Sequence, residues 1–322
     1  MTISFYGMCV AEWRKIRGRG LAYAVLLFGL LHGIAVPFLA DLLGPVFGWV
    51  ADNVLKHPAE EASLFDWLVA GDLSLTAATS PLNSLVLLLL ASVLWSQDFS
   101  LGTMAMIFVR PVSRLRVFLS KVAVCWGLAF ASLGLALAAG LLIGMPLFGS
   151  SGDVGTLAQI ETCISPPCWP YVSWMAEVSD EALAAGDAAK PVVLGVIPRL
   201  LGIFQGLLLG TLMMGPLLGL TALIANLTRS PVLTLFGSLF ILLADGMVHW
   251  ALWAWGKVDS LVGNEAAGEL SEWTIWASRD FYGLHGSGEL FAQGGQNLLA
   301  TTIYTVVFFG LAGLLFIRRD VT

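Results

Sequence analysis

The chain has 322 residues, of which 57% are hydrophobic and only 12% are charged. Soluble domains carry about 25% charged residues, so this composition excludes an ordinary soluble fold and indicates a membrane protein. The net charge of −6 is unevenly distributed, because basic and acidic residues are segregated along the chain.

Residues 1–20 are the first predicted element, an amphipathic helix that lies in the plane of the lipid headgroups. Apolar residues recur there at steps of three and four positions, at Phe5, Cys9, Trp13 and Ile16. Charged residues occupy a different arc of the helix, at Glu12, Lys15 and Arg19. An interfacial helix turns its basic residues toward anionic lipid, and the alternative is a plain anchor that follows the positive-inside rule. Because no apolar run precedes these charges, we expect no cleavable signal peptide.

Six apolar runs are long enough to cross a bilayer as helices, which takes about 20 residues. They lie near residues 21–43, 81–97, 117–148, 196–225, 231–256 and 296–317. The second run is short, and we expect its helix to begin around Leu75. Ser80-Pro81 and Ser230-Pro231 each combine a capping residue with a first-turn proline, which favours a helix start. The sequence therefore predicts an all-α membrane protein with six transmembrane helices in residues 21–322.

Lysine and arginine residues indicate which side of the membrane each connecting segment occupies. Eleven of them fall in the N-terminal segment, the connectors at about 96–121 and 226–230, and the C-terminus, against five on the opposite side, four of them in the opposite segments and Arg199 at the start of the fourth apolar run. Most acidic residues lie in those opposite segments, which are three long loops at about 44–75, 149–195 and 257–295. We therefore expect cytoplasmic termini and outer loops of considerable length.

The connector between the second and third predicted spans contains an ordered pattern: an acid four positions before Gly-Thr, an apolar stretch, and then Arg-Pro-Val-Ser-Arg. The residues of this pattern are Asp98, Gly102, Thr103, Arg110, Pro111, Ser113 and Arg114. Pro111 breaks a helix and Ser113 can cap the next one, while Lys121 is expected to stay in cytosolic water. A short apolar helix between such breaks is suited to act as a lever in a partner's groove, and the alternative is an ordinary basic loop.

This pattern resembles the connector after the second span in permease subunits of ABC-2 family exporters. There the usual form is Glu-x-x-x-Gly-Thr, an apolar stretch and then x-Pro-x-Ser-Arg, and Asp98 replaces the glutamate here. The resemblance implies an N-terminal interfacial elbow helix, and a connector whose seven pattern residues couple to a separate cytoplasmic ATPase. It also implies a bacterial inner-membrane protein that pairs with a second copy of itself or with a related permease.

The function implied by the resemblance is a permease that couples ATP hydrolysis by the partner to export or extraction of a substrate. The chain has no Gly-x-x-x-x-Gly-Lys-Ser/Thr loop, no Gly-x-Ser-x-Gly and no His-Glu-x-x-His, so we expect no ATPase or hydrolase activity in it. We expect no metal or cofactor in this chain, with ATP and magnesium bound by the ATPase. Two alternatives stay open, a membrane-integral enzyme and a scaffold for a periplasmic partner. A fold does not identify the substrate.

Two cysteines, Cys163 and Cys168, frame Ile-Ser-Pro-Pro in the second outer loop. An oxidising compartment permits a disulfide there, which would stabilise by about 2 kcal/mol in the chain-entropy model. Free thiols or a metal pair are the alternatives, but no histidine lies nearby in the sequence to complete a metal site. Cys9 and Cys125 fall toward the cytoplasm, where we expect them to be reduced.

Asp245 and His249 share one face of the fifth predicted span. A carboxylate near the bilayer centre is unfavourable by about 2.5–3.5 kcal/mol on insertion scales, so Asp245 needs a partner or a polar cavity. The pair either lines a substrate path or forms an internal hydrogen bond, and it carries the enzyme alternative. His32 in the first span is a candidate third member, although a lone histidine is more often satisfied locally.

Overall fold

The computed structural model describes residues 4–18, 20–50, 67–79, 81–101, 113–148, 196–259, 270–271, 273–275 and 294–318. Apart from short turns these residues are α-helical, and no strand occurs among them. In chain order the helices are α1 (Phe5–Arg17), α2 (Leu21–Val50), α3 (Trp67–Ala78), α4 (Pro81–Ser100), α6 (Arg114–Phe148), α10 (Val196–Met213), α11 (Gly215–Thr228), α12 (Pro231–Asp259) and α15 (Gly294–Arg318).

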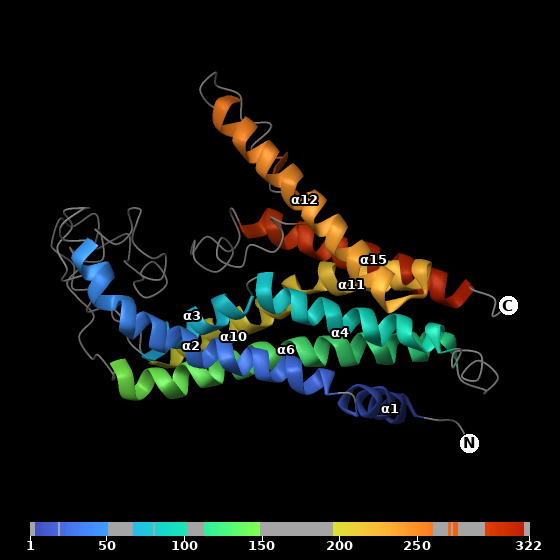
Figure 1. Ribbon diagram of the computed structural model, residues 1–322, viewed down its shortest axis with the longest axis horizontal. Coiled ribbons are helices and arrows are strands. Elements are labelled where there is room, and N and C mark those ends of the chain that lie inside the picture. The colour runs from blue at the N-terminus through green and yellow to red at the C-terminus, as the bar shows by residue number, and fades with distance from the viewer. Residues whose placement is uncertain are drawn as a thin grey trace.

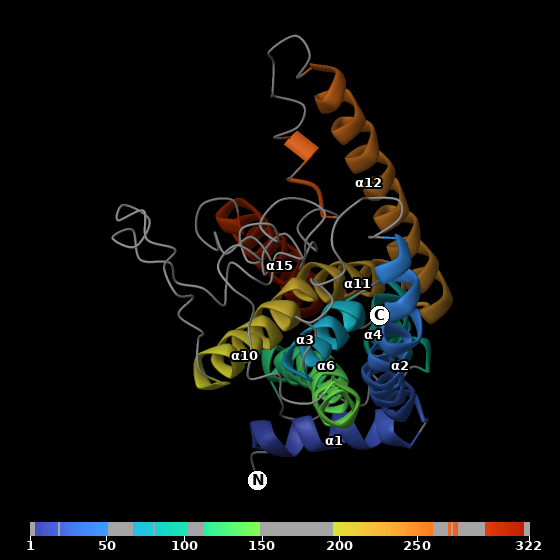
Figure 2. The same cartoon turned by 90° about the vertical axis from the view of Figure 1, so that its left-hand side faces the viewer.

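Most of the long helices lie side by side along the long axis of the molecule (Figure 1). Helix α1 lies across one end of them (Figure 2), and the C-terminal end of α15 is at that same end. Helix α6 packs against α1, α2, α3, α10 and α15, whereas α11 packs against α15, α4 and α12. Helix α6 thus contacts both the N-terminal helix and several helices of the bundle.

Close packing of α2 against α6 depends on two glycines four residues apart. A Cβ atom at Gly29 would overlap the carbonyl group of Ser132, and one at Gly33 would overlap that of Ala136. The Ser132 hydroxyl also donates a hydrogen bond of 3.1 Å to the carbonyl oxygen of Val25. Small residues at this spacing let two backbones approach closely, so the α2–α6 contact is fixed by backbone as well as by side chains.

Two predicted spans differ from the observed helices. The fourth was expected as one helix over 196–225, but it divides into α10 and α11 at Met214, where Pro216 lies in the first turn of the second helix. The second was expected to begin near Leu75, but α3 ends at Ala78 and α4 begins at Pro81. The Asn83 side-chain amide donates a 2.7 Å hydrogen bond to the carbonyl of Ala78, which closes the end of α3.

The predicted outer loops also contain helix. The first was placed at 44–75, yet α2 continues to Val50 and α3 starts at Trp67. Helix α3 has 12 residues, too few to cross a bilayer, and it packs on α6 and α2. The second loop, 149–195, lies outside the described residues. Part of the third, at 270–275, lies against α12 and α15 and is described with the polar residues below.

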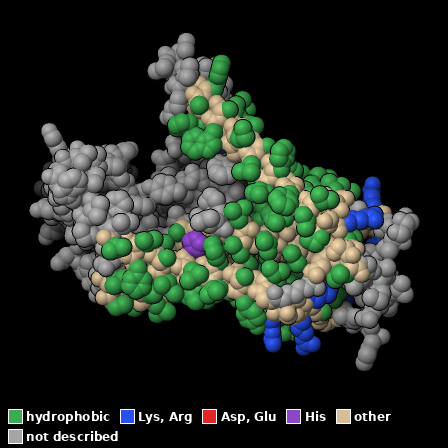
Figure 3. All heavy atoms as spheres, viewed as in Figure 1, with side chains coloured by type: hydrophobic (Ala, Val, Ile, Leu, Met, Phe, Trp, Pro, Cys, Tyr) green, Lys and Arg blue, Asp and Glu red, His purple; other side chains and the backbone are tan. Residues whose placement is uncertain are grey.

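The described helices carry large apolar surfaces. Five helical stretches are long and apolar enough to span a membrane: Leu21–Leu39, Arg114–Leu147, Ile203–Thr228, Pro231–Gly256 and Leu298–Arg318. Helix α4, the second predicted span, is not among these five stretches. Figure 3 shows apolar side chains over the flanks of the helices and over α12, and lysine and arginine side chains at the end where α1 lies. This distribution indicates an integral membrane protein.

Candidate functional site

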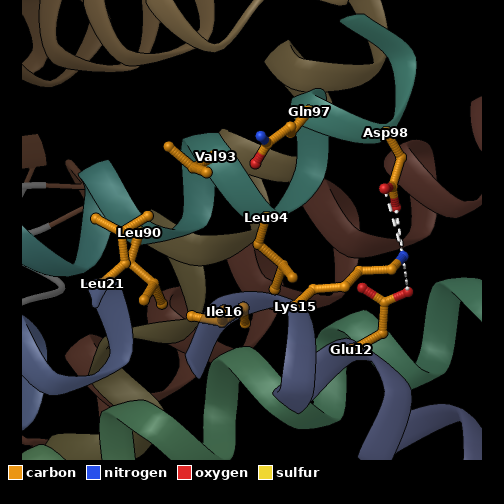
Figure 4. A pocket seen from close by; sticks show the side chains of 9 residues that line it. All are labelled: Glu12, Lys15, Ile16, Leu21, Leu90, Val93, Leu94, Gln97 and Asp98. Carbon is orange, nitrogen blue, oxygen red and sulfur yellow. Dashed lines mark hydrogen bonds and ion pairs between the residues drawn. The ribbon is translucent and has the colours of Figure 1, made fainter. Parts of the chain in front are cut away.

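Four charged side chains meet where α1 crosses the end of α4 and the start of α6. They are Glu12 and Lys15 on α1, Asp98 on α4, and Lys121 on α6. We refer to these four residues as the charge network. Figure 4 shows Lys15 reaching toward Asp98 and Glu12, with Asp98 approaching from the opposite helix.

Lys121 is the buried centre of the charge network. Its side chain is only 1% exposed. The Nζ atom donates hydrogen bonds to Asp98 Oδ2 at 2.7 Å, to the carbonyl oxygen of Leu94 at 2.8 Å, and to Glu12 Oε2 at 3.2 Å. An ammonium group has three N–H donors, so each donor has an acceptor. The lysine is held in its charged form without an unsatisfied hydrogen bond.

Lys15 occupies the outer side of the charge network. Its Nζ atom lies 2.9 Å from Glu12 Oε1 and 3.1 Å and 3.3 Å from the two carboxylate oxygens of Asp98. The Lys15 side chain is 36% exposed, in contrast to the buried carboxylates. Two ammonium and two carboxylate groups sum to zero charge, which is the condition for burying charges at tolerable cost.

The environment of Asp98 shifts the pKa of its carboxyl group. Burial alone would raise this pKa, but the ammonium groups of Lys121 and Lys15 outweigh it through charge attraction and hydrogen bonds, and the pKa falls from 3.8 to about 2. Asp98 follows the predicted span 81–97, where the chain leaves the bilayer. At neutral pH the carboxylate is therefore ionised, and ionisation favours the observed contacts.

The charge network corrects two expectations from the sequence. Glu12 was placed on the outer, polar arc of the first helix, but it is 5% exposed and lies on the buried face with Met8 and Ile16. Lys121 was expected in cytosolic water, but its residue is fully buried. A signal was present in the sequence, because Lys121 stands inside an apolar run that begins near Val117, and a lysine there needs a buried partner.

A small opening beside the charge network leads to Lys15. Apolar side chains of α1, α2 and α4 line it together with Gln97 and the charged groups, as Figure 4 shows. The Oε1 atom of Gln97 is buried there and has no hydrogen-bond partner among the residues that the structure describes.

The connector residues of the sequence pattern are only partly described. Gly102, Thr103, Arg110 and Pro111 lie outside the described residues, and Asp98 belongs to the charge network. The Ser113 hydroxyl accepts a 3.4 Å hydrogen bond from the backbone N–H of Arg116, which confirms the predicted cap of α6. Arg114 donates a 2.9 Å hydrogen bond to the carbonyl oxygen of Ile317 at the end of α15. A coupling role for these residues stays a prediction.

Asp245 and His249 each bond to the described residues 270–271 and 273–275, which belong to the third predicted outer loop. Asp245 Oδ1 accepts a 3.2 Å hydrogen bond from the backbone N–H of Ile275. His249 Nδ1 lies 3.0 Å from the carbonyl oxygen of Ser271 and 3.1 Å from the Thr274 hydroxyl. These contacts favour the internal hydrogen-bond reading over a substrate path.

The remaining candidate polar residues either have hydrogen-bond partners nearby, are free thiols, or lie outside the described residues. His32 Nδ1 is 2.8 Å from the carbonyl oxygen of Phe28 in the preceding turn of α2. Cys9 and Cys125 are free thiols, as expected, and burial raises the pKa of Cys9. Cys163 and Cys168 lie outside the described residues, so their disulfide stays a prediction. In the described part of the chain, no group of three or more His, Cys, Asp or Glu residues could hold a metal ion.

Part of the chain is similar to a known protein family. No curated protein and no solved structure matches the chain. Residues 11–165, just under half of the chain, match the model described as ABC-2 family transporter protein. The matched stretch contains all four residues of the charge network and the whole connector. The match over residues 11–165 confirms the resemblance to ABC-2 permeases that the connector pattern indicated.

Proposed function

We propose that this chain is the membrane-spanning permease subunit of an ATP-driven exporter, and that a separate cytoplasmic ATPase supplies the energy. The match of residues 11–165 to ABC-2 family transporter proteins carries the proposal. Long apolar helices with exposed apolar faces support the membrane location. The acid-x-x-x-Gly-Thr and Arg-Pro-Val-Ser-Arg elements support a connector that meets the ATPase.

The charge network supports a mechanical route for coupling. Asp98 lies four residues before Gly102, and Lys121 lies seven residues after Arg114, so the two residues flank the connector. Their 2.7 Å ion pair joins α4 to α6 at the base of the connector. Under the proposal, a force on the connector moves both helices together, and Glu12 and Lys15 pass the displacement to α1.

The full topology belongs to the same proposal. It has six spans, cytoplasmic termini, α1 as an interfacial elbow helix and long loops outside a bacterial inner membrane. The C-terminal end of α15 lies at the same end of the bundle as α1, which is compatible with termini on one side (Figure 1). A second permease copy or a related permease would complete the transport pathway. The enzyme alternative is not carried further, because Asp245 and His249 bond to the segment 270–275.

Purification of a tagged chain from its own host membranes tests the proposal. We expect an ATPase subunit to co-purify and the assembly to hydrolyse Mg-ATP, whereas the chain purified alone after detergent dissociation does not. Reconstitution of the two subunits should restore the activity. ATP hydrolysis by the isolated chain, or an inactive chain without an ATPase under any mild extraction, would contradict the proposed function.

A further inference from the structure

The four charges form a closed square of ion pairs across the boundary between α1 and the bundle. Two of the four ion pairs do not cross this boundary. Glu12 pairs with Lys15 within α1, and Asp98 of α4 pairs with Lys121 of α6 within the bundle. The other two sides cross the boundary: Glu12 with Lys121, and Lys15 with Asp98. If the crossing pairs break, each carboxylate still has an ammonium partner on its own side.

This division removes the usual penalty for breaking a buried ion pair. Separation of two buried partners normally leaves an uncompensated charge, which is strongly unfavourable. Here α1 would leave with a neutral Glu12–Lys15 pair spaced i, i+3, a spacing at which helical side chains face each other. The bundle would keep Lys121 bound to Asp98 and to the carbonyl oxygen of Leu94.

Apart from the charge network, α1 packs on the bundle through Met8 and Ile16, with Cys9 and Trp13 partly buried beside them, and Gly20 lies in its link to α2. Met8 and Ile16 are the buried apolar residues of α1, and lipid tails can cover them when an interfacial helix moves. Gly20 has φ +73° with nothing within 4 Å of the position a Cβ would take. Glycine is therefore required there for the backbone conformation and not for packing.

We propose that α1 is a detachable helix, which docks on and leaves α4 and α6 as the charge network divides into the neutral pairs Glu12–Lys15 and Asp98–Lys121. The contact of Lys15 with Asp98 is the first to open, because the Lys15 side chain is the most exposed of the four. The docked and undocked states of α1 then have similar electrostatic free energies. Binding of a partner or of a lipid surface to one state can therefore shift the equilibrium between them. Docking and release of α1 do not require an ATPase, and only the use of this motion in transport rests on the proposed function.

Spin labels on the full chain measure the two states directly. Tyr6 on α1 and Leu115 on α6 are 78% and 49% exposed, so cysteines there leave the interface intact when Cys9, Cys125, Cys163 and Cys168 are replaced by alanine. Pulsed electron–electron distance measurements in lipid nanodiscs, without ATP or an ATPase, report the α1–α6 separation. Failure of the proposed function therefore does not affect the outcome.

Two variants that share Lys15→Gln and retain Lys121 give the decisive comparison. Glu12→Gln with Lys15→Gln leaves only the Asp98–Lys121 pair inside the bundle, and we expect the longer-distance population to rise about tenfold. Asp98→Asn with Lys15→Gln leaves only the Glu12–Lys121 pair across the boundary, and we expect α1 to stay docked. Both variants remove one positive and one negative charge.

Equal distance distributions in the two variants, or release of α1 in the second variant and not in the first, would overturn the proposal. If either variant fails to fold, a second comparison uses Lys121→Met with Asp98→Asn against Lys121→Met with Glu12→Gln. The first of these leaves a pair on α1 and should release the helix. The second leaves the Lys15–Asp98 pair across the boundary and should hold it.

Discussion

Lys121 lies near the start of α6, where its ammonium group is enclosed by two carboxylates and one backbone carbonyl. A buried lysine of this kind is tolerated only while its partners remain charged. The four charges are mutually dependent, so the effect of removing one is decided by which others remain. Paired substitutions therefore distinguish the stability that comes from balanced charges from the stability that one side chain contributes.

Removal of Lys121 alone should lower the stability of the fold far more than removal of Lys121 together with one carboxylate. Lys121→Met leaves Glu12 and Asp98 with Lys15 as their remaining ammonium partner in the charge network, and we expect it to lower the free energy of unfolding by about 3 kcal/mol. The double variant with Asp98→Asn should recover most of this loss. Thermal unfolding in one detergent provides the comparison, and an equally unstable double variant would argue against charge balance as the cause.

The lowered pKa of Asp98 makes a prediction about acid. Because the folded-state pKa is about 2 against an ordinary 3.8, Asp98 adds about 2 kcal/mol of stability at neutral pH. This contribution is fully present above the ordinary pKa and is lost as the pH falls from about 4 to about 2. The difference in melting temperature between the wild type and Asp98→Asn should stay constant from pH 7 to 5 and shrink below 4. A constant difference down to pH 2 would mean that the pKa is not lowered.

At the scale of elements, α12 and α15 are joined by the outer segment 270–275. Asp245 and His249 of α12 bond to it, and the Tyr304 hydroxyl of α15 donates a hydrogen bond to the carbonyl of Trp273. Asp245 and His249, which were first considered for chemistry in the membrane, thus attach a segment of the third predicted outer loop to α12.

Asp245→Leu should release this segment without preventing membrane insertion. The backbone N–H of Ile275 loses its acceptor, so its deuterium exchange, measured by mass spectrometry on the peptide that covers 270–275, should accelerate by about tenfold. His32→Leu is the control, because His32 bonds within α2. Unchanged exchange in Asp245→Leu would show that the hydrogen bond does not hold the segment.

The second outer loop carries the predicted link between Cys163 and Cys168. Their short spacing and expected position outside the cytoplasm favour a disulfide. Non-reducing peptide mapping of protein isolated without reductant should recover the two cysteines in one linked fragment, and Cys9 in alkylated form. Recovery of Cys163 and Cys168 as alkylated thiols would refute the link.

Across the whole molecule, hydropathy predicted the long apolar helices well because continuous apolar runs leave few other folds. It missed α3, because hydropathy over the length of a membrane span does not detect a 12-residue helix that contains Asp72. It missed the break at Met214, where Pro216 stands within an uninterrupted apolar run. The partners of Lys121 could not be predicted, because they come from helices 23 and 109 residues away in the sequence.

Under the proposed function, the connector after α4 transmits force between this chain and an ATPase. ATP turnover of the assembled complex in proteoliposomes tests it with Arg110→Glu and Arg114→Glu combined, against Arg229→Glu as a control. Arg229 is exposed at the end of α11, so its reversal changes charge on a different connector. Arg114→Gln can still donate a hydrogen bond toward Ile317. This variant therefore distinguishes an effect on ATPase docking from an effect of losing the α6–α15 contact.

We expect the double reversal to dissociate the ATPase or to reduce substrate-stimulated ATP turnover at least about tenfold, since like charges would face the docking surface. The Arg229→Glu control should retain wild-type assembly and turnover. Unchanged assembly together with unchanged stimulated turnover in the double reversal would contradict the account.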